Sequence, residues 1–126
     1  MQGRILVIDD AEGTRRWVTT LLRRHDYEVD EAGDGRTGLA LLSEHPETCV
    51  VVLDLLMENG DGWWFRDHQL SDPAIAAVPV IVLSIAPATE CLRYSLKAHQ
   101  MLHKIPSPDD LLTAIETARD RSEPIA

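Results

Sequence analysis

The sequence has few basic residues, and this shortage limits the partners that it can bind directly. Twelve lysines and arginines stand against 21 aspartates and glutamates, which gives a net charge of −9 and an isoelectric point near 4.8. Proteins that bind nucleic acid or anionic lipid draw most of their affinity from a basic surface. We therefore expect this chain to bind neither nucleic acid nor membranes.

Long apolar runs, a leader peptide and a cysteine framework are also missing. Runs such as Ile5–Ile8 and Cys49–Leu53 are far shorter than the roughly 20 residues that a transmembrane helix needs. No charged and then apolar leader precedes a small-residue cleavage site. Cys49 and Cys91 form neither a metal motif nor a disulfide framework, and we interpret Cys49 as a small buried apolar residue. These absences favour a cytoplasmic protein.

What is present is the composition of one globular domain. The chain has 126 residues, of which 44% are hydrophobic and 26% are charged. It shows no internal repeat, low-complexity tract or linker. We expect a single domain over residues 1–122 and a frayed tail over residues 123–126.

Short apolar segments and helical patterns alternate along the chain. Continuous apolar runs are typical of strands that are buried on both faces of a parallel sheet. Capping and breaking residues bound most of the helical patterns. Such alternation predicts an α/β fold with three layers, in which helices cover both faces of a parallel sheet. The expected strands are Ile5–Ile8, Tyr27–Ala32, Cys49–Leu53, Val80–Leu83 and Met101–His103, and the expected helices include Trp17–Leu22, Asp34–Leu42, Trp64–Gln69, Thr89–Ala98 and Ser107–Ile115.

Polar residues follow four of the predicted strands at the point where each strand ends. Asp9 and Asp10 follow the first strand, Asp54 the third, Ser84 the fourth and Lys104 the fifth. The functional crevice of an open parallel sheet lies outside these carboxyl ends. Clustered carboxylates suit Mg²⁺, while a lysine and a serine can pair with phosphoryl oxygens.

The chain resembles the receiver domain of two-component response regulators over nearly its whole length. The resemblance implies a doubly wound, flavodoxin-like fold with five helices and a five-stranded sheet of order 2-1-3-4-5. The motifs that carry it, in order, are Ile5-Leu-Val-Ile-Asp-Asp10, Tyr27-Glu-Val29, Ala32-Gly-Asp-Gly35, Val52-Leu-Asp-Leu-Leu-Met57, Asp61-Gly62, Pro79-Val-Ile-Val-Leu-Ser84 and Lys104.

The resemblance also implies a role for each reacting residue. Asp54 matches the phosphoacceptor, whose carboxylate attacks a phosphohistidine of a partner. Lys104 matches the lysine that pairs with the phosphoryl oxygens, and Ser84 matches the hydroxyl that contacts the phosphoryl group. The implied partners are a sensor histidine kinase or phosphotransfer protein, and an output protein or an effector domain missing from this chain.

A magnesium site is implied as well. Asp9 and Asp10 match the acidic pair that binds Mg²⁺ together with Asp54 and the backbone carbonyl of Leu56. The residues support this, because an anionic carboxylate that attacks an anionic phosphorus centre is strongly repelled unless positive charge is present.

Simpler interpretations exist for each residue taken alone. Asp10 could cap the first helix, Ser84 could be a turn or cap residue, and Lys104 could be a solvated surface lysine. A carboxylate such as Asp54 at the end of a buried strand is costly unless it is paired or metal-bound. The joint placement of these residues favours the phosphoryl-transfer site.

Four positions depart from the family's pattern. Ile85 stands where a small residue is usual, and we expect its branched side chain to slow labelling by small phosphodonors. Met101 stands where Tyr or Phe often acts as a switch, and methionine cannot make the tyrosine's hydrogen bond. Output through the fourth helix, fifth strand and fifth helix is therefore either absent or uses a different relay. Ile105 separates the lysine from Pro106, and Glu58 stands where proline is common.

We expect an autocatalytic phosphoacceptor that signals through protein contacts, rather than a turnover enzyme. One alternative is a pseudo-receiver that binds partners without phosphorylation. Ile85 and Met101 keep this alternative open, whereas the presence of the reacting residues argues against it: Asp9, Asp10, Asp54, Ser84 and Lys104. Another is a magnesium phosphatase with an aspartyl-phosphate intermediate. That enzyme needs a second acid/base carboxylate, for which Glu58 is the candidate, and a cap segment for which the chain has no room.

Overall fold

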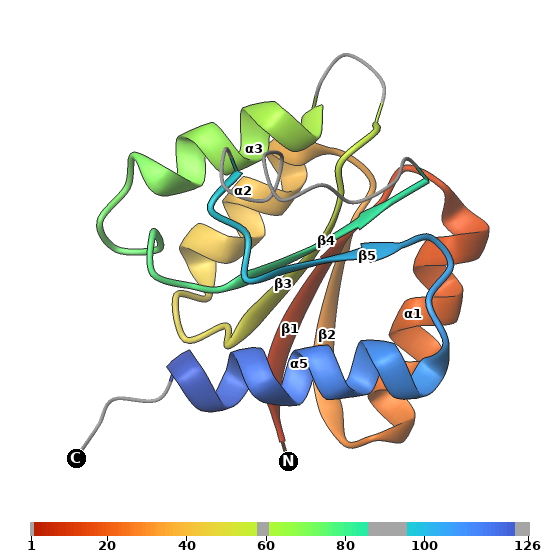
Figure 1. Cartoon of the computed structure of the whole chain (residues 1–126). Coiled ribbons are helices and arrows are strands. Elements are labelled where there is room, and N and C mark those ends of the chain that lie inside the picture. Colours follow the sequence, from red (N-terminus) through yellow and green to blue (C-terminus); the bar gives the residue numbers. More distant parts are fainter. Residues whose placement is uncertain (1, 58–60, 86–95, 123–126) are drawn as a thin grey trace.

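The computed structural model describes residues 2–57, 61–85 and 96–122, in which strands and helices alternate (Figure 1). Four helices are present in these ranges, and none of them is long and apolar enough to span a membrane. The helix expected over Thr89–Ala98 falls mostly on residues 86–95, outside the described residues, as does the tail 123–126. The elements are β1 (Gly3–Ile8), α1 (Glu12–Arg24), β2 (Tyr27–Ala32), α2 (Gly35–Glu44), β3 (Val50–Asp54), α3 (Asp61–Leu70), β4 (Val80–Ser84), β5 (Gln100–His103) and α5 (Pro108–Ser122).

The five strands form one parallel sheet of order β2-β1-β3-β4-β5, which confirms the predicted fold class. Helices α2 and α3 cover one face, and α1 and α5 cover the other (Figure 1). Parallel pairing brings the carboxyl ends of the strands to one edge, where Asp54 of β3 pairs with Leu83 and Ser84 of β4 pairs with His103. The sheet therefore places the predicted site residues at a common edge.

Each face of the sheet has its own hydrophobic core. Leu6, Ile8 and Leu53 belong to the core that includes Phe65 of α3, whereas Ile5 and Val7 belong to the core under α1 and α5. Strands β3 and β4 are buried along their whole length, which explains their continuous apolar sequences.

The bounds of several elements follow the predicted capping and breaking residues. The backbone N–H of Thr37 donates to Asp34 Oδ1 at 2.8 Å at the start of α2, and that helix ends two residues before Pro46. Similarly, the N–H of Asp110 donates to Ser107 Oγ at 3.1 Å at the start of α5. These caps confirm the predicted starts of both helices.

One sequence interpretation is wrong in detail. Cys49 lies before β3 rather than in it, and it is only partly buried. Its backbone N–H and its thiol both donate to the carbonyl oxygen of Arg4, at 2.9 and 3.2 Å. Partial burial raises the pKa of this thiol, so Cys49 stays protonated at neutral pH.

Candidate functional site

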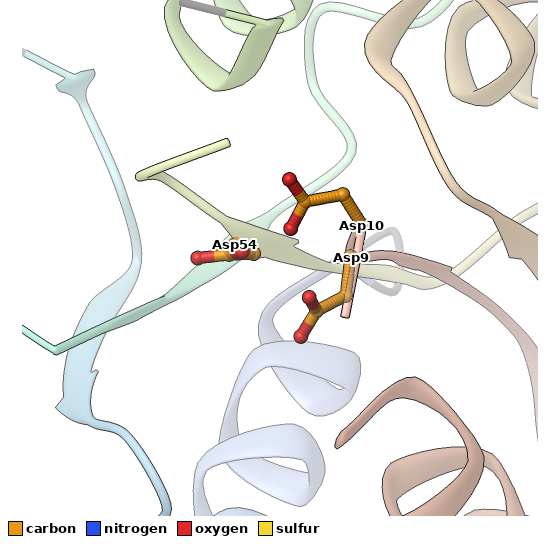
Figure 2. A group of neighbouring side chains, drawn as sticks. All are labelled: Asp9, Asp10 and Asp54. Carbon is orange, nitrogen blue, oxygen red and sulfur yellow. The ribbon is translucent and has the colours of Figure 1, made fainter. Parts of the chain in front are cut away.

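Three carboxylates meet at the carboxyl edge of the sheet, where β1 and β3 lie side by side. Asp9 and Asp10 directly follow β1, and Asp54 is the last residue of β3. One oxygen from each carboxylate lies within 4.8 Å of the others, and Figure 2 shows the three groups gathered at one point. Asp9 and Asp54 are buried, whereas Asp10 is exposed. The structure thus brings together the three acids that the sequence predicted as neighbours.

Main-chain contacts hold Asp9 in this position. Its N–H donates to the carbonyl oxygen of Ala32 on β2 at 3.0 Å, and its own carbonyl accepts from Arg15 Nη1 at 2.8 Å. Its Oδ1 accepts the N–H of Ala11 at 2.8 Å. Ala11 is the N-cap residue of α1 and has no side-chain cap, so the alternative in which Asp10 caps this helix is wrong.

Lys104 joins the carboxylates from the end of β5. Its Nζ lies 3.0 Å from Asp9 Oδ2 and 3.4 Å from Asp54 Oδ2. The lysine side chain is only 10% exposed, so it is not a solvated surface lysine. Its backbone N–H donates to the carbonyl oxygen of Ser84 at 2.8 Å, which fixes the end of β5 against β4. One ammonium against three carboxylates leaves the site with a negative charge that suits a cation.

The electrostatic environment shifts the pKa of both Asp54 and Lys104. Burial and the charge of Asp9 raise the pKa of Asp54 to about 6, although Lys104 opposes this shift. Burial lowers the pKa of Lys104, but the hydrogen bond to Asp9 and the charges of both carboxylates raise it further, and the net shift is upward. At neutral pH, Asp54 is therefore mostly an anion beside a firmly protonated lysine.

This shift predicts how Asp54→Asn changes the dependence of stability on pH. Between about pH 4 and the pKa of about 6, the folded protein binds more protons than the unfolded chain, so the Asp54 contribution to the unfolding free energy falls as pH rises through that window. Asparagine removes the buried charge. We expect Asp54→Asn to unfold at a higher urea concentration than the wild type at about pH 8, with the difference closing at about pH 4.

Urea unfolding at the two pH values measures this difference. Asp67→Asn, which changes an exposed carboxylate on α3, is the control for the loss of an acidic side chain away from the site. A difference between Asp54→Asn and the wild type that is equal at both pH values would contradict the prediction.

The donor atoms of the site fit a hard divalent cation. Asp9 Oδ2 is buried and accepts no hydrogen bond from the described residues. Lys104 Nζ lies 3.0 Å from it but donates its hydrogen bond to Asp9 Oδ1, at 3.3 Å. Asp9 Oδ2 and the carboxylates of Asp10 and Asp54 form an all-oxygen set of the kind that Mg²⁺ prefers. These three residues could therefore hold a metal ion. The role of the Leu56 carbonyl stays a prediction; the side chain of Leu56 is half exposed.

Two glycines permit close backbone contacts at the start of α3, and sequence reasoning gave neither of them a role. A methyl group at Gly62 would place its carbon 2.5 Å from the carbonyl oxygen of Leu55 and 3.0 Å from that of Asp54. A methyl group at Gly35 would lie 2.7 Å from the carbonyl oxygen of Asp61, whose Oδ2 accepts the Gly35 N–H at 3.1 Å. Helix α3 therefore rests directly on the backbone after Asp54. The Asp61-Gly62 motif was the only sequence signal for this contact.

The remaining predicted residues lie at or near the same edge. Ser84 is buried at the end of β4, next to β3. Ile85 and Ile105 are 66% and 62% exposed, and Met101 is buried in the core under α2 and α3. The Lys104–Ile105 peptide bond is cis. Glu58 lies outside the described residues, and the effect of Ile85 on labelling stays a prediction.

Comparison with known families decides what kind of domain carries this site. A sequence profile of the family described as "Response regulator receiver domain" matches residues 5–116. The chain belongs to the response regulator receiver family. The matched range of this receiver domain includes all the residues predicted for the site.

Relatives of the receiver domain include longer regulators and a solved structure of similar length. The response regulator PleD of Caulobacter vibrioides is 34% identical over 85 residues, which make up 67% of this chain and 18% of PleD. The transcriptional regulatory protein GltR of Pseudomonas aeruginosa is 29% identical over 125 residues, 94% of this chain and 50% of GltR. The matched part of this chain thus spans 50% of the length of GltR and 18% of the length of PleD. The chemotaxis protein CheY4 of Vibrio cholerae shares the fold, with a TM-score of 0.84 at 24% identity over 92% of this chain and 98% of that one.

Proposed function

We propose that Asp54 of this receiver domain accepts a phosphoryl group in a Mg²⁺-dependent reaction. The donor is the phosphohistidine of a sensor histidine kinase or phosphotransfer protein. The phosphorylated domain then signals through contacts with an output protein or an effector domain, in the cytoplasm. The proposal rests on one observation: the Asp54 carboxylate ends the central strand between the Asp9–Asp10 pair and the Lys104 ammonium.

The chemistry follows from the charges around Asp54. An oxygen of the ionised carboxylate attacks phosphorus, the P–N bond to the donor imidazole breaks, and its electron pair stays on the imidazole. The product is an aspartyl phosphate. With a pKa of about 6, Asp54 needs no general base at neutral pH. Lys104 Nζ, held by Asp9 at 3.0 Å, offers positive charge to the phosphoryl oxygens.

A metal ion would complete this charge balance. Asp9, Asp10 and Asp54 would hold Mg²⁺, which when bound supplies the positive charge that offsets the repulsion between the carboxylate and the phosphoryl group. Lys104 alone cannot balance three carboxylates and an incoming phosphoryl group. We therefore expect the reaction to depend on the metal, and we propose autocatalytic acceptance of the phosphoryl group rather than turnover.

Mass spectrometry of the labelled chain tests the proposal. The protein is incubated with acetyl phosphate or a phosphohistidine protein, in Mg²⁺ or in excess chelator. We expect one phosphoryl group with Mg²⁺, located in the peptide that contains Asp54, and none with chelator. Label in another peptide, or labelling that the chelator does not change, would contradict the proposal. Acetyl phosphate should label more slowly than the protein donor if Ile85 crowds the site.

A further inference from the structure

Helix α3 carries a buried arginine that the proposed reaction does not use. Arg66 is only 5% exposed. Its Nε donates to the carbonyl oxygen of Leu96 and its Nη2 to that of Lys97, both at 2.7 Å, while its Nη1 donates to Gln69 Oε1 at 2.7 Å. Among the described residues, all its hydrogen-bond partners are neutral oxygens. Burial without a counter-charge lowers the pKa of Arg66 to about 10, so the group is still charged at neutral pH.

Gln69 extends this network to a second loop. Its Nε2 donates to the carbonyl oxygens of Ile75 and Val78, both at 3.0 Å. These carbonyls precede β4, and those of Leu96 and Lys97 precede β5. Two side chains of α3 thus bind the backbone just before two strands of the sheet. Figure 1 shows the segment before β5 beside α3.

The other end of α3 is fixed to the phosphoacceptor. Gly62 lets the first turn rest on the backbone of Asp54 and Leu55, with no space for even a methyl group. Arg66 lies four residues further along the helix, about 6 Å along the axis. Phe65 is fully buried in the core between these two anchor points. A displacement of the backbone after Asp54 therefore has to move α3, and α3 holds Leu96 and Lys97 through Arg66.

We propose that the Arg66–Gln69 network is the joint that transmits a change at Asp54 to the backbone before β5. This inference rests on the proposed function in that phosphorylation is the change transmitted. It supplies a relay that does not need a tyrosine at position 101, where this chain has Met101. Through Leu96 and Lys97, the joint acts on the strand that carries Met101 and leads to Lys104.

The energetics of a buried guanidinium favour two discrete states of this joint. A buried charge that loses a hydrogen-bond acceptor incurs a large desolvation penalty. The guanidinium therefore either keeps all three hydrogen bonds or breaks all three and becomes exposed to solvent. The arginine makes the contact between α3 and residues 96–97 a switch between two arrangements.

Amide chemical shifts of the full chain test the joint directly. Spectra are recorded with and without Mg²⁺ and beryllofluoride for the wild type, for Arg66→Met and for Arg66→Lys. The exposed Arg16→Met on α1 serves as the control. In the wild type and the control, we expect Mg²⁺ and beryllofluoride to change the amide chemical shifts at Asp54–Leu55 and at Leu96–Ala98. In Arg66→Met the shifts at Leu96–Ala98 should be lost, while those at Asp54–Leu55 remain. Arg66→Lys keeps the charge but only one donor nitrogen, and should show reduced transmission.

The possible outcomes distinguish a failure of the joint from a failure of the proposed phosphoacceptor. Two results would overturn the joint and leave the phosphoacceptor intact. In one, the amide shifts of the wild type change only at Asp54–Leu55. In the other, the shifts at Leu96–Ala98 change in Arg66→Met as much as they do in the wild type. No shift anywhere would count against the proposed function. The joint is then tested by Gly62→Ala, which displaces α3 mechanically. Its effect should reach Leu96–Ala98 when Arg66 is present and not in the double variant with Arg66→Met; equal effects would overturn the joint.

Discussion

Phosphoryl labelling is expected to fall to background when Asp54 is replaced by asparagine. The amide has no anionic oxygen to attack phosphorus, and the buried neighbour Asp9 is engaged by other groups. Asp9 is buried and already accepts the Ala11 N–H and pairs with Lys104. Intact-mass spectrometry of the wild type and Asp54→Asn, with Mg²⁺ and the same donor, measures the loss.

The matched control is Asp67→Asn, which changes an exposed acid on α3 and should be labelled as the wild type is. Equal labelling of the wild type and Asp54→Asn would place the acceptor elsewhere. A wild type that is not labelled by any donor, together with an Asp54→Asn variant that keeps its cellular function, would favour the pseudo-receiver. The experiment thus distinguishes the two functions that share this fold.

Gly62→Ala is expected to lower the unfolding free energy by about 1–3 kcal/mol, the usual cost of an overpacked site. The new methyl carbon would lie 2.5 Å from the carbonyl oxygen of Leu55 and 2.9 Å from its Cα. These are backbone atoms of the segment that follows β3, and they cannot rotate away as a flexible side chain can. The helix therefore has to move off Asp54, and we expect labelling to slow as well.

Gly13→Ala provides a close control because Gly13 is also the second residue of its helix. A methyl group at Gly13 would have no neighbour within 4 Å. Alanine should raise the unfolding free energy by up to about 1 kcal/mol through its higher helix propensity. Urea unfolding of the two variants measures the contrast. Similar stabilities for both variants would show that the contact between α3 and Leu55 is loose.

The position of the candidate site could be predicted because it depends on simple features. The apolar runs before Asp9 and Asp54 identify buried parallel strands, and parallel strands end at one edge of a sheet. Any polar residue that directly follows such a strand must lie near the others. The same reasoning placed Ser84 and Lys104 at this edge without any knowledge of the side-chain contacts.

The Arg66–Gln69 network could not be predicted in the same way. Its acceptors are backbone carbonyls, such as those of Ile75 and Leu96, which look alike at every position of a sequence. Charged and amide side chains are usually exposed, so the pattern gives no sign that Arg66 and Gln69 are buried. The close contact at Gly62 was hidden for a related reason, because it depends on the distance between two backbone segments.

Strand β2 forms one open edge of the sheet, and its composition has a consequence for the behaviour of many copies of this chain. Half of its residues are acidic: Glu28, Asp30 and Glu31. The unpaired backbone groups of an open edge can pair with a strand from another copy. Charged side chains on the edge strand oppose such pairing. Each of these acids is paired with an arginine: Arg4 contacts Glu28 and Asp30, and Arg15 and Arg23 contact Glu31. A strand from another copy would have to displace these charged side chains from water before it could pair with β2, so crowded copies of the protein should resist extending their sheets along this edge.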